Sequence, residues 1–219
     1  MQPPPAPRPI EQRQPALDLL DDQRIERLGS DGFFVVDGFL GTEAALAIRG
    51  EALALSHAGT LRPAGLGRGD ALRLERAARG DEIAWLDPQE SPPALRAFLG
   101  RLESVRDEVN RGAYLGLRRY EVQVARYDRG AGYVRHRDAF PGGPNRTLTA
   151  IYYLNDGWIP AHGGALRLFP TGREPLELAP LLDRLVVFRS ADLEHEVCPS
   201  WAERLAVTAW FYGREDLPR

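Results

Sequence analysis

Two of the four histidines in the 219-residue chain have neighbours that suit a metal ion. His136 is followed two positions later by Asp138, and side chains at positions i and i+2 of an extended segment point to the same side. His195 comes much later, at the expected start of another strand. Two imidazoles and one carboxylate leave coordination positions open and form the facial triad typical of non-haem iron(II) sites. These three residues are therefore a candidate metal site, although their spacing alone often occurs by chance.

A second candidate group lies on the expected strand 204–212. Arg204, Ala206, Thr208 and Trp210 alternate along it, so they share one face. An arginine beside a small residue and a hydroxyl is typical of a pocket floor. An inward guanidinium requires an anion, and its fork of donors suits a carboxylate. No acidic residue close in sequence on this face is an obvious partner, so the pattern predicts a dicarboxylate cosubstrate.

The elements that must position these residues change in kind along the chain. Helical periodicity predicts helices over 17–28, 41–58 (with Thr42 as a candidate N-cap) and 91–112, and an extended segment over 33–40. After Tyr120, turn signals separate short expected strands at 121–127, 148–155, 164–170, 184–190 and 204–212. Helices first and strands later predict an α+β fold, a double-stranded β-helix (jelly roll) with helices packed on one sheet.

The domain organisation follows from composition. Residues 1–15 hold six prolines and are expected to form a disordered arm. Residues 16–219 are expected to form a single domain, with the jelly-roll core over 120–213. The stretch 59–79 is rich in glycine and arginine and is predicted to be an exposed hairpin or mobile loop.

Composition also excludes several functions. The net charge is −3 and no basic run is present, which argues against nucleic acid as the partner. All 28 cationic residues are arginine, so lysine Schiff-base chemistry and a P-loop are excluded. No apolar run is long enough for a membrane helix and no signal pattern precedes the domain, so we expect a cytoplasmic protein. Cys198 is the only cysteine and is expected to be a small buried hydrophobe.

The order of these motifs resembles a known family. His136-Arg137-Asp138, His195 and Arg204 are similar to the 2-oxoglutarate- and Fe(II)-dependent dioxygenases. The segments 127–136 and 151–155 resemble the prolyl 4-hydroxylase branch. The similarity is strongest to the hypoxia-inducible-factor prolyl hydroxylases and their bacterial counterparts, and it runs from about residue 32 to 213. It includes Arg79-Gly80-Asp81 and Trp85.

The resemblance implies a role for each matching residue. Arg204 would pair with the distal carboxylate of 2-oxoglutarate and Tyr153 would donate a hydrogen bond to it. Thr208 would line the same pocket, and Tyr127 would lie near its iron-side end. The substrate side would comprise Arg146, Trp210, Arg79, Asp81 and Tyr133. The stretch 59–79 would be the finger loop that closes over a peptide. The chain departs from the animal enzymes in a 127–136 loop that is one residue shorter, and in the sequence of the finger.

The implied cofactors are Fe(II), 2-oxoglutarate and O2, with ascorbate as a candidate helper. The implied activity is 4-hydroxylation of a prolyl residue in an exposed loop of a protein, with elongation factor Tu suggested by bacterial members. Neither nucleic acid nor membrane is an expected partner.

Other hypotheses remain open at this point. The same chemistry would serve a small molecule or a free amino acid, and a non-catalytic module would sense oxygen or 2-oxoglutarate. A zinc hydrolase is disfavoured because no general base is obvious beside His136 and Asp138. Among the aromatic residues, Tyr152 is expected to pack in the core on the face opposite Tyr153. His57 and His162 are expected to be structural or exposed.

Overall fold

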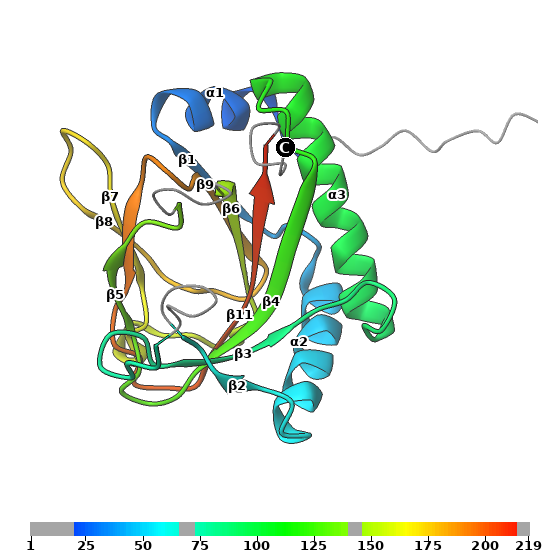
Figure 1. Ribbon diagram of the computed structural model, residues 1–219, viewed down its shortest axis with the longest axis vertical. Helices are drawn as coiled ribbons and strands as arrows, with labels where there is room; N and C mark the ends of the chain where they lie inside the picture. The colour runs from blue at the N-terminus through cyan, green and yellow to red at the C-terminus, as the bar shows by residue number, and fades with distance from the viewer. Residues whose placement is uncertain (1–19, 66–72, 140–145, 214–219) are drawn as a thin grey trace, which may run out of the picture.

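The computed structural model describes residues 20–65, 73–139 and 146–213, so the predicted proline-rich arm lies outside the described residues. Three helices cover one side of a large sheet, and a smaller sheet lies on the other side (Figure 1). Within the described ranges, no helix is both long and apolar enough to cross a membrane. The predicted α+β jelly roll with helices on one sheet is therefore confirmed.

Both sheets are antiparallel. The seven-stranded sheet has the order β1-β9-β6-β11-β4-β3-β2 and the four-stranded sheet the order β5-β10-β7-β8. The strands are β1 (Phe33–Asp37), β2 (Arg62–Pro63), β3 (Asp81–Trp85), β4 (Arg119–Tyr127), β5 (Tyr133–His136), β6 (Arg146–Tyr153), β7 (Leu166–Phe169), β8 (Leu176–Leu178), β9 (Arg184–Arg189), β10 (Glu194–Val197) and β11 (Arg204–Tyr212).

The helices are α1 (Asp22–Ser30), α2 (Thr42–His57) and α3 (Pro93–Ala113), with a short 3-10 turn at Pro160–His162. The first begins at Asp22, where the carboxylate of Asp21 accepts a hydrogen bond from the Arg24 amide and caps the helix, and residues 17–19 of the predicted helix lie outside the described residues. Thr42 as N-cap is wrong, because Gly41 occupies that position without a side-chain cap. The distant carboxylate of Asp183 accepts from the amides of Leu40 and Gly41 instead.

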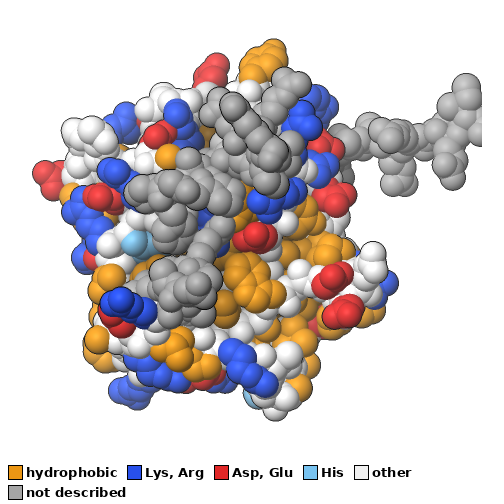
Figure 2. All heavy atoms as spheres, viewed as in Figure 1, with side chains coloured by type: hydrophobic (Ala, Val, Ile, Leu, Met, Phe, Trp, Pro, Cys, Tyr) orange, Lys and Arg blue, Asp and Glu red, His pale blue; other side chains and the backbone are white. Residues whose placement is uncertain are grey.

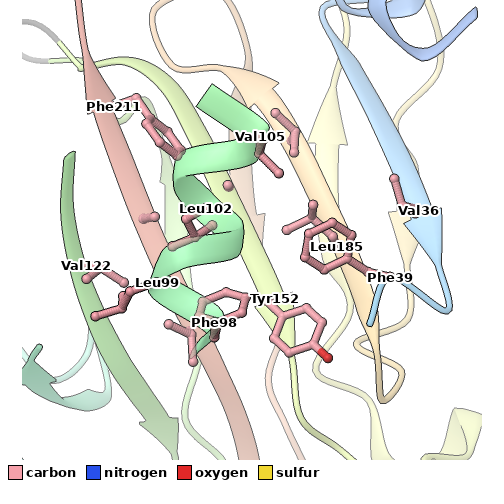
Figure 3. Packing of buried hydrophobic residues seen from close by; sticks show 14 of the residues in the cluster. Val36, Phe39, Phe98, Leu99, Leu102, Val105, Val122, Tyr152, Leu185 and Phe211 are labelled. Carbon is pink, nitrogen blue, oxygen red and sulfur yellow. The ribbon is translucent and has the colours of Figure 1, made fainter. Parts of the chain in front are cut away.

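Strand β11 divides the interior into two parts by its alternation. Its odd-numbered side chains, such as Val207 and Phe211, pack in the larger core beneath the helices. In this core α3 lies across the strands and directs Leu99 and Leu102 toward them (Figure 3). The even-numbered side chains, from Arg204 to Trp210, face the space between the two sheets. Because side chains alternate between the two faces of a strand, the residues that stabilise the fold are separated from the residues that could bind ligands or take part in a reaction.

The Gly/Arg-rich stretch 59–79 is tied down at both ends. Its first part forms β2, which pairs with β3 and extends the large sheet. The guanidinium of Arg79 donates to the carbonyl of Gly65, and the Val134 amide donates to the carbonyl of Ala78. Residues 66–72, the rest of the predicted finger loop, lie outside the described residues.

Candidate metal centre and cleft

The three predicted metal ligands meet on two neighbouring strands of the small sheet. His136 ends β5, His195 lies in β10, and the two are register partners in the antiparallel pair. Asp138 follows β5 directly. One carboxylate oxygen lies 3.6 Å from Nε2 of His136, and the other lies 3.6 Å from Nε2 of His195. Within the described residues, this is the only group of three or more such side chains that could share one ion.

Backbone carbonyls set the orientation of both imidazoles. Nδ1 of His136 lies 2.8 Å from the carbonyl oxygen of Val134, and Nδ1 of His195 lies 3.3 Å from that of Leu193. An Nδ1–H that donates to a carbonyl leaves the Nε2 lone pair free for a metal. Burial lowers the pKa of His195 to about 4, so its ring is neutral at neutral pH, which is the form that ligates.

The Asp138 carboxylate is held ionised and oriented by its neighbours. Burial alone would raise its pKa, but His195, His136 and Arg146 outweigh that effect and hold the pKa well below its usual range. The Thr149 hydroxyl donates to Oδ2 at 2.8 Å and lies 2.8 Å from the Ser190 hydroxyl. Two imidazoles and a carboxylate, with ligand atoms all within 4.8 Å of one another, fit the donor set of an iron(II) facial triad.

Arg204 lies in a second, closed part of the space between the sheets. It is 1% exposed, which excludes a surface arginine, and its Nε donates to the Gly164 carbonyl at 2.8 Å. Its Nη2 atom and the hydroxyl of Tyr153 are both buried and have no hydrogen-bond partner in the described ranges. A buried donor without a partner is unfavourable, so an acceptor from outside would complete both. A carboxylate fits this pair of groups.

The close approach at Gly164 allows Arg204 to lie here. Gly164 has a φ of +65°, and a Cβ at this position would come within 3.1 Å of Cδ of Arg204 and 2.9 Å of the Ser200 hydroxyl. The rings of Tyr127 and Tyr153 flank the guanidinium at 5.0 Å. Burial raises the pKa of both tyrosines, so they remain protonated at neutral pH. Thr208 lies on the same inward face.

An open cleft of about 920 Å³ leads from the surface to Asp138. Figure 2 shows hydrophobic side chains gathered near β3 and β4 on this face, among basic and acidic groups. Two of the expected substrate residues, Arg146 and Trp210, line the cleft, and the guanidinium stacks 3.7 Å from the indole. The Nη1 atom of Arg146 lies 3.9 Å from a carboxylate oxygen of Asp138.

Three other expected substrate residues form one contact group. Arg79 and Asp81 make a bidentate ion pair at 2.8 and 3.0 Å, and the Asp81 side chain is fully buried. The guanidinium of Arg79 lies 4.9 Å from the ring of Tyr133, which in turn stacks 3.7 Å from the His136 ring. Arg79 and Tyr133 line the cleft.

The remaining sequence expectations have mixed outcomes. Tyr152 packs in the core beneath the helices and Tyr153 on the opposite face, as predicted. His57 is exposed at the end of α2, and Nδ1 of His162 accepts from the Ile159 amide, so neither joins the triad. The expectation that Cys198 is buried is wrong, because it is partly exposed near Glu196.

Sequence reasoning missed several residues of the site. Thr149 and Ser190 orient Asp138, and Gln123 lines the cleft. Their signal lies in cross-strand register: Thr149 is the partner of Trp210, and Gln123 is the partner of Thr208. One segment alone does not reveal such pairs.

Comparisons with known proteins agree with this geometry. Residues 122–212 match the 2OG-Fe(II) oxygenase superfamily. The mouse prolyl hydroxylase EGLN3 is 36% identical over 192 residues, which cover 84% of this chain and 80% of that protein. The chain belongs to this prolyl hydroxylase family of 2-oxoglutarate- and Fe(II)-dependent oxygenases. Its cofactor is therefore Fe(II), held by His136, Asp138 and His195, and its cosubstrate is 2-oxoglutarate.

Other prolyl hydroxylases extend the comparison. Human Egl nine homolog 1 is 36% identical over 217 residues, but the chain spans only about half of it (49%). A Pseudomonas putida prolyl-4-hydroxylase has a TM-score of 0.80 and 34% identity, over 88% of this chain and 98% of that one. A Trichoplax adhaerens prolyl hydroxylase, in complex with a hypoxia-inducible-factor peptide fragment, has a TM-score of 0.81 and 29% identity, over 88% and 89%.

Proposed function

We propose that the chain hydroxylates C4 of a prolyl residue in a protein, using Fe(II), 2-oxoglutarate and O2. One observation carries the proposal: the complete facial triad is flanked by a closed pocket with unpaired polar groups and by an open cleft. On one side, Arg204 and Tyr153 are closed in and require an acid. On the other, a cleft of about 920 Å³ opens from Asp138 to the surface. This division suits a small dicarboxylate and a large substrate at the same metal.

In this proposal Arg204 and Tyr153 bind the distal carboxylate of 2-oxoglutarate. The guanidinium offers its free Nη2 and the tyrosine its hydroxyl, and both lie where water is excluded. Charge-assisted hydrogen bonds are strong in such surroundings. Thr208 lines the cosubstrate pocket, and the ring of Tyr127 lies beside the Arg204 guanidinium, at the distal end of the pocket rather than the iron-side end that the resemblance implied. The cosubstrate thereby extends from Arg204 toward the triad.

When bound, iron with 2-oxoglutarate and O2 would supply the oxidation that inserts one oxygen atom into the prolyl C4–H bond and places the other in succinate, as 2-oxoglutarate loses CO2. The chain's own residues contribute position and shielding. Thr149 holds Asp138 in its ligating orientation, and the two backbone carbonyls hold the imidazoles. The rings of Tyr133 and Phe188, stacked or tilted against His136 and His195, limit access of water to the ligands.

The cleft residues would hold the protein substrate. Arg146 and Trp210 form its inner wall, while Arg79, fixed by Asp81, and Tyr133 form the wall beside β2 and β3. The stretch 59–79 would act as the finger loop over a bound peptide, and an exposed proline loop fits the open entrance. Elongation factor Tu, which the resemblance to bacterial members suggested, is the first candidate to test.

Mass spectrometry with ¹⁸O₂ tests the proposal. Elongation factor Tu and a bacterial lysate are incubated with the protein, Fe(II) and 2-oxoglutarate, with His136→Ala as the blank. We expect a gain of one ¹⁸O on a proline, absent in the blank. Succinate formation with oxygen gained by free proline alone would replace the protein substrate with a small molecule. Tight 2-oxoglutarate binding without succinate would favour a sensing module.

A further inference from the structure

Gln123 presents its carboxamide to the cleft. The residue is 2% exposed, lies in the middle of β4 and lines the cleft wall. Within residues 20–65, 73–139 and 146–213, its side chain makes no hydrogen bond to the protein. A carboxamide has two donors and an acceptor, and those of Gln123 are turned to the cleft rather than to protein partners. The position therefore points to a polar group that arrives from outside.

A second unpaired donor lies beside it. Nε1 of Trp210 is buried without a hydrogen-bond partner in the same described ranges. Gln123 is flanked in register by Trp85 of β3 and Thr208 of β11. The rings of Trp85 and Trp210 have their centroids 5.9 Å apart. The Gln123 carboxamide and the Trp210 N–H therefore lie beside the two indole rings. This small area can hydrogen-bond a polar group of a ligand and pack against an apolar one.

This area adjoins the metal centre on the substrate side. Trp210 is the register partner of Thr149, whose hydroxyl donates to the ligand Asp138. Gln123, Trp85 and Trp210 all line the open cleft, whereas Arg204 and Tyr153 do not. The unpaired carboxamide therefore faces the space for the substrate rather than the closed pocket for the dicarboxylate.

A peptide bond is the chemical complement of a carboxamide. Its carbonyl accepts from the side-chain NH2 group, and its N–H donates to Oε1. Because proline has no N–H of its own, the peptide bond on its C-terminal side is the adjoining bond that offers both groups. The pyrrolidine ring suits the indole faces. A free proline would present a carboxylate there, which repels Oε1.

We propose that Gln123 hydrogen-bonds the peptide bond that follows the target proline, and so selects a prolyl residue within a chain over free proline. This inference rests on the proposed prolyl hydroxylation and names the backbone group that is recognised. Gln123 is a specificity-determining residue in this reading, because it contacts the substrate next to the reacting carbon.

The test pairs Gln123→Met with a change in the substrate backbone. The probe is a pool of peptides with one central proline and randomised flanks. A second pool carries an ester in place of the amide after the proline, which removes the N–H. For the wild type we expect the amide pool to be hydroxylated about 5–10-fold faster than the ester pool, as for one lost hydrogen bond. For Gln123→Met we expect equal rates for both pools.

Binding and control measurements make the outcome decisive. Fluorescence anisotropy of the labelled amide pool, measured without oxygen, should show that Gln123→Met binds these peptides about 5–10-fold more weakly than the wild type. The KM for 2-oxoglutarate should be the same for both proteins. Gln23→Met, the same substitution on exposed α1, should leave the amide preference intact. Gln123→Leu repeats the test if the first variant has a lowered Tm.

Two results would overturn the inference. The first is an amide preference that persists in Gln123→Met and Gln123→Leu, and the second is a raised KM for 2-oxoglutarate alone. If the wild type hydroxylates no peptide at all while it forms succinate, the proposed protein substrate fails as well, so the two failures are distinguishable.

Discussion

The metal centre and the two cavities beside it differ in how far the protein satisfies its own polar groups. Around the triad, carbonyls of Val134 and Leu193 and the Thr149 hydroxyl already hold every ligand. In the flanking cavities, Arg204, Tyr153 and Trp210 keep buried polar atoms without partners in the described residues. The protein therefore fixes the iron ligands in advance and leaves the partners of the other groups to the molecules it binds.

The largest effect is expected for a ligand itself. His195→Ala removes one of three donors, and since even the partners of ligands typically change affinity by 10–100-fold, we expect iron affinity and turnover to fall about 1000-fold or more. Iron content after dialysis and succinate formation measure this. The far-UV circular dichroism should match the wild type. If the iron affinity of His195→Ala stayed within a few-fold of the wild-type value, the assignment of His195 as an iron ligand would be wrong.

The next effect separates the cosubstrate pocket from the metal centre. Arg204→Ala leaves an incoming carboxylate without its charged partner, so we expect the KM for 2-oxoglutarate to rise about 30- to 100-fold. Iron affinity should stay within about threefold, because the Arg204 guanidinium donates to the Gly164 carbonyl rather than to one of the three ligands. Equal losses of iron and 2-oxoglutarate binding would mean that the two regions are not independent.

A smaller effect tests the prearrangement of Asp138. Thr149→Val keeps the shape of the side chain but removes the hydroxyl that donates to Oδ2. We expect iron affinity to fall about 10-fold, with a minor change in the KM for 2-oxoglutarate. Competition with a metal chelator measures the first and initial rates the second. Unchanged iron affinity would show that the carboxylate needs no such partner.

The smallest effect concerns the glycine that lets Arg204 approach. Gly164→Ala places a Cβ at φ +65°, close to Arg204 and Ser200, and we expect a loss of about 1–2 kcal/mol in the free energy of unfolding. Gly172→Ala is the matched control, because Gly172 has a φ of +72° with open space around its Cβ position. Both variants should lose stability in urea, but only Gly164→Ala should raise the KM for 2-oxoglutarate.

The metal ligands were the most predictable part of the molecule. The i, i+2 spacing of His136 and Asp138 and the alternation from Arg204 to Trp210 are local patterns, and a strand preserves them wherever it packs. The helices were predictable for the same reason, with errors at their ends. The segment that leads into α2 is held by Asp183, more than a hundred residues away, which accepts from the amides of Leu40 and Gly41, so no local signal identifies the start of the helix.

The edge strand β2 and the cleft residue Gln123 could not be predicted from local sequence, because their roles depend on residues that are distant in the chain. β2 has two residues, and it exists as a strand because it pairs with β3. Gln123 looks like any polar residue on a strand until register places it opposite Thr208. Cross-strand register is set by the whole sheet, so sequence reasoning on single segments could not find these positions.

The register of β5 on β10 has a mechanical consequence. β5 is four residues long and Val134 is half exposed, so few apolar contacts hold it to its neighbour. An ion bound by His136 and His195 joins the two strands at one of their two register pairs, the other being Tyr133 and Val197. The iron is then a cross-link as well as a reagent: a one-residue slip of β5 would turn an imidazole away from it. The thermal stability of the small sheet should therefore increase with the concentration of iron.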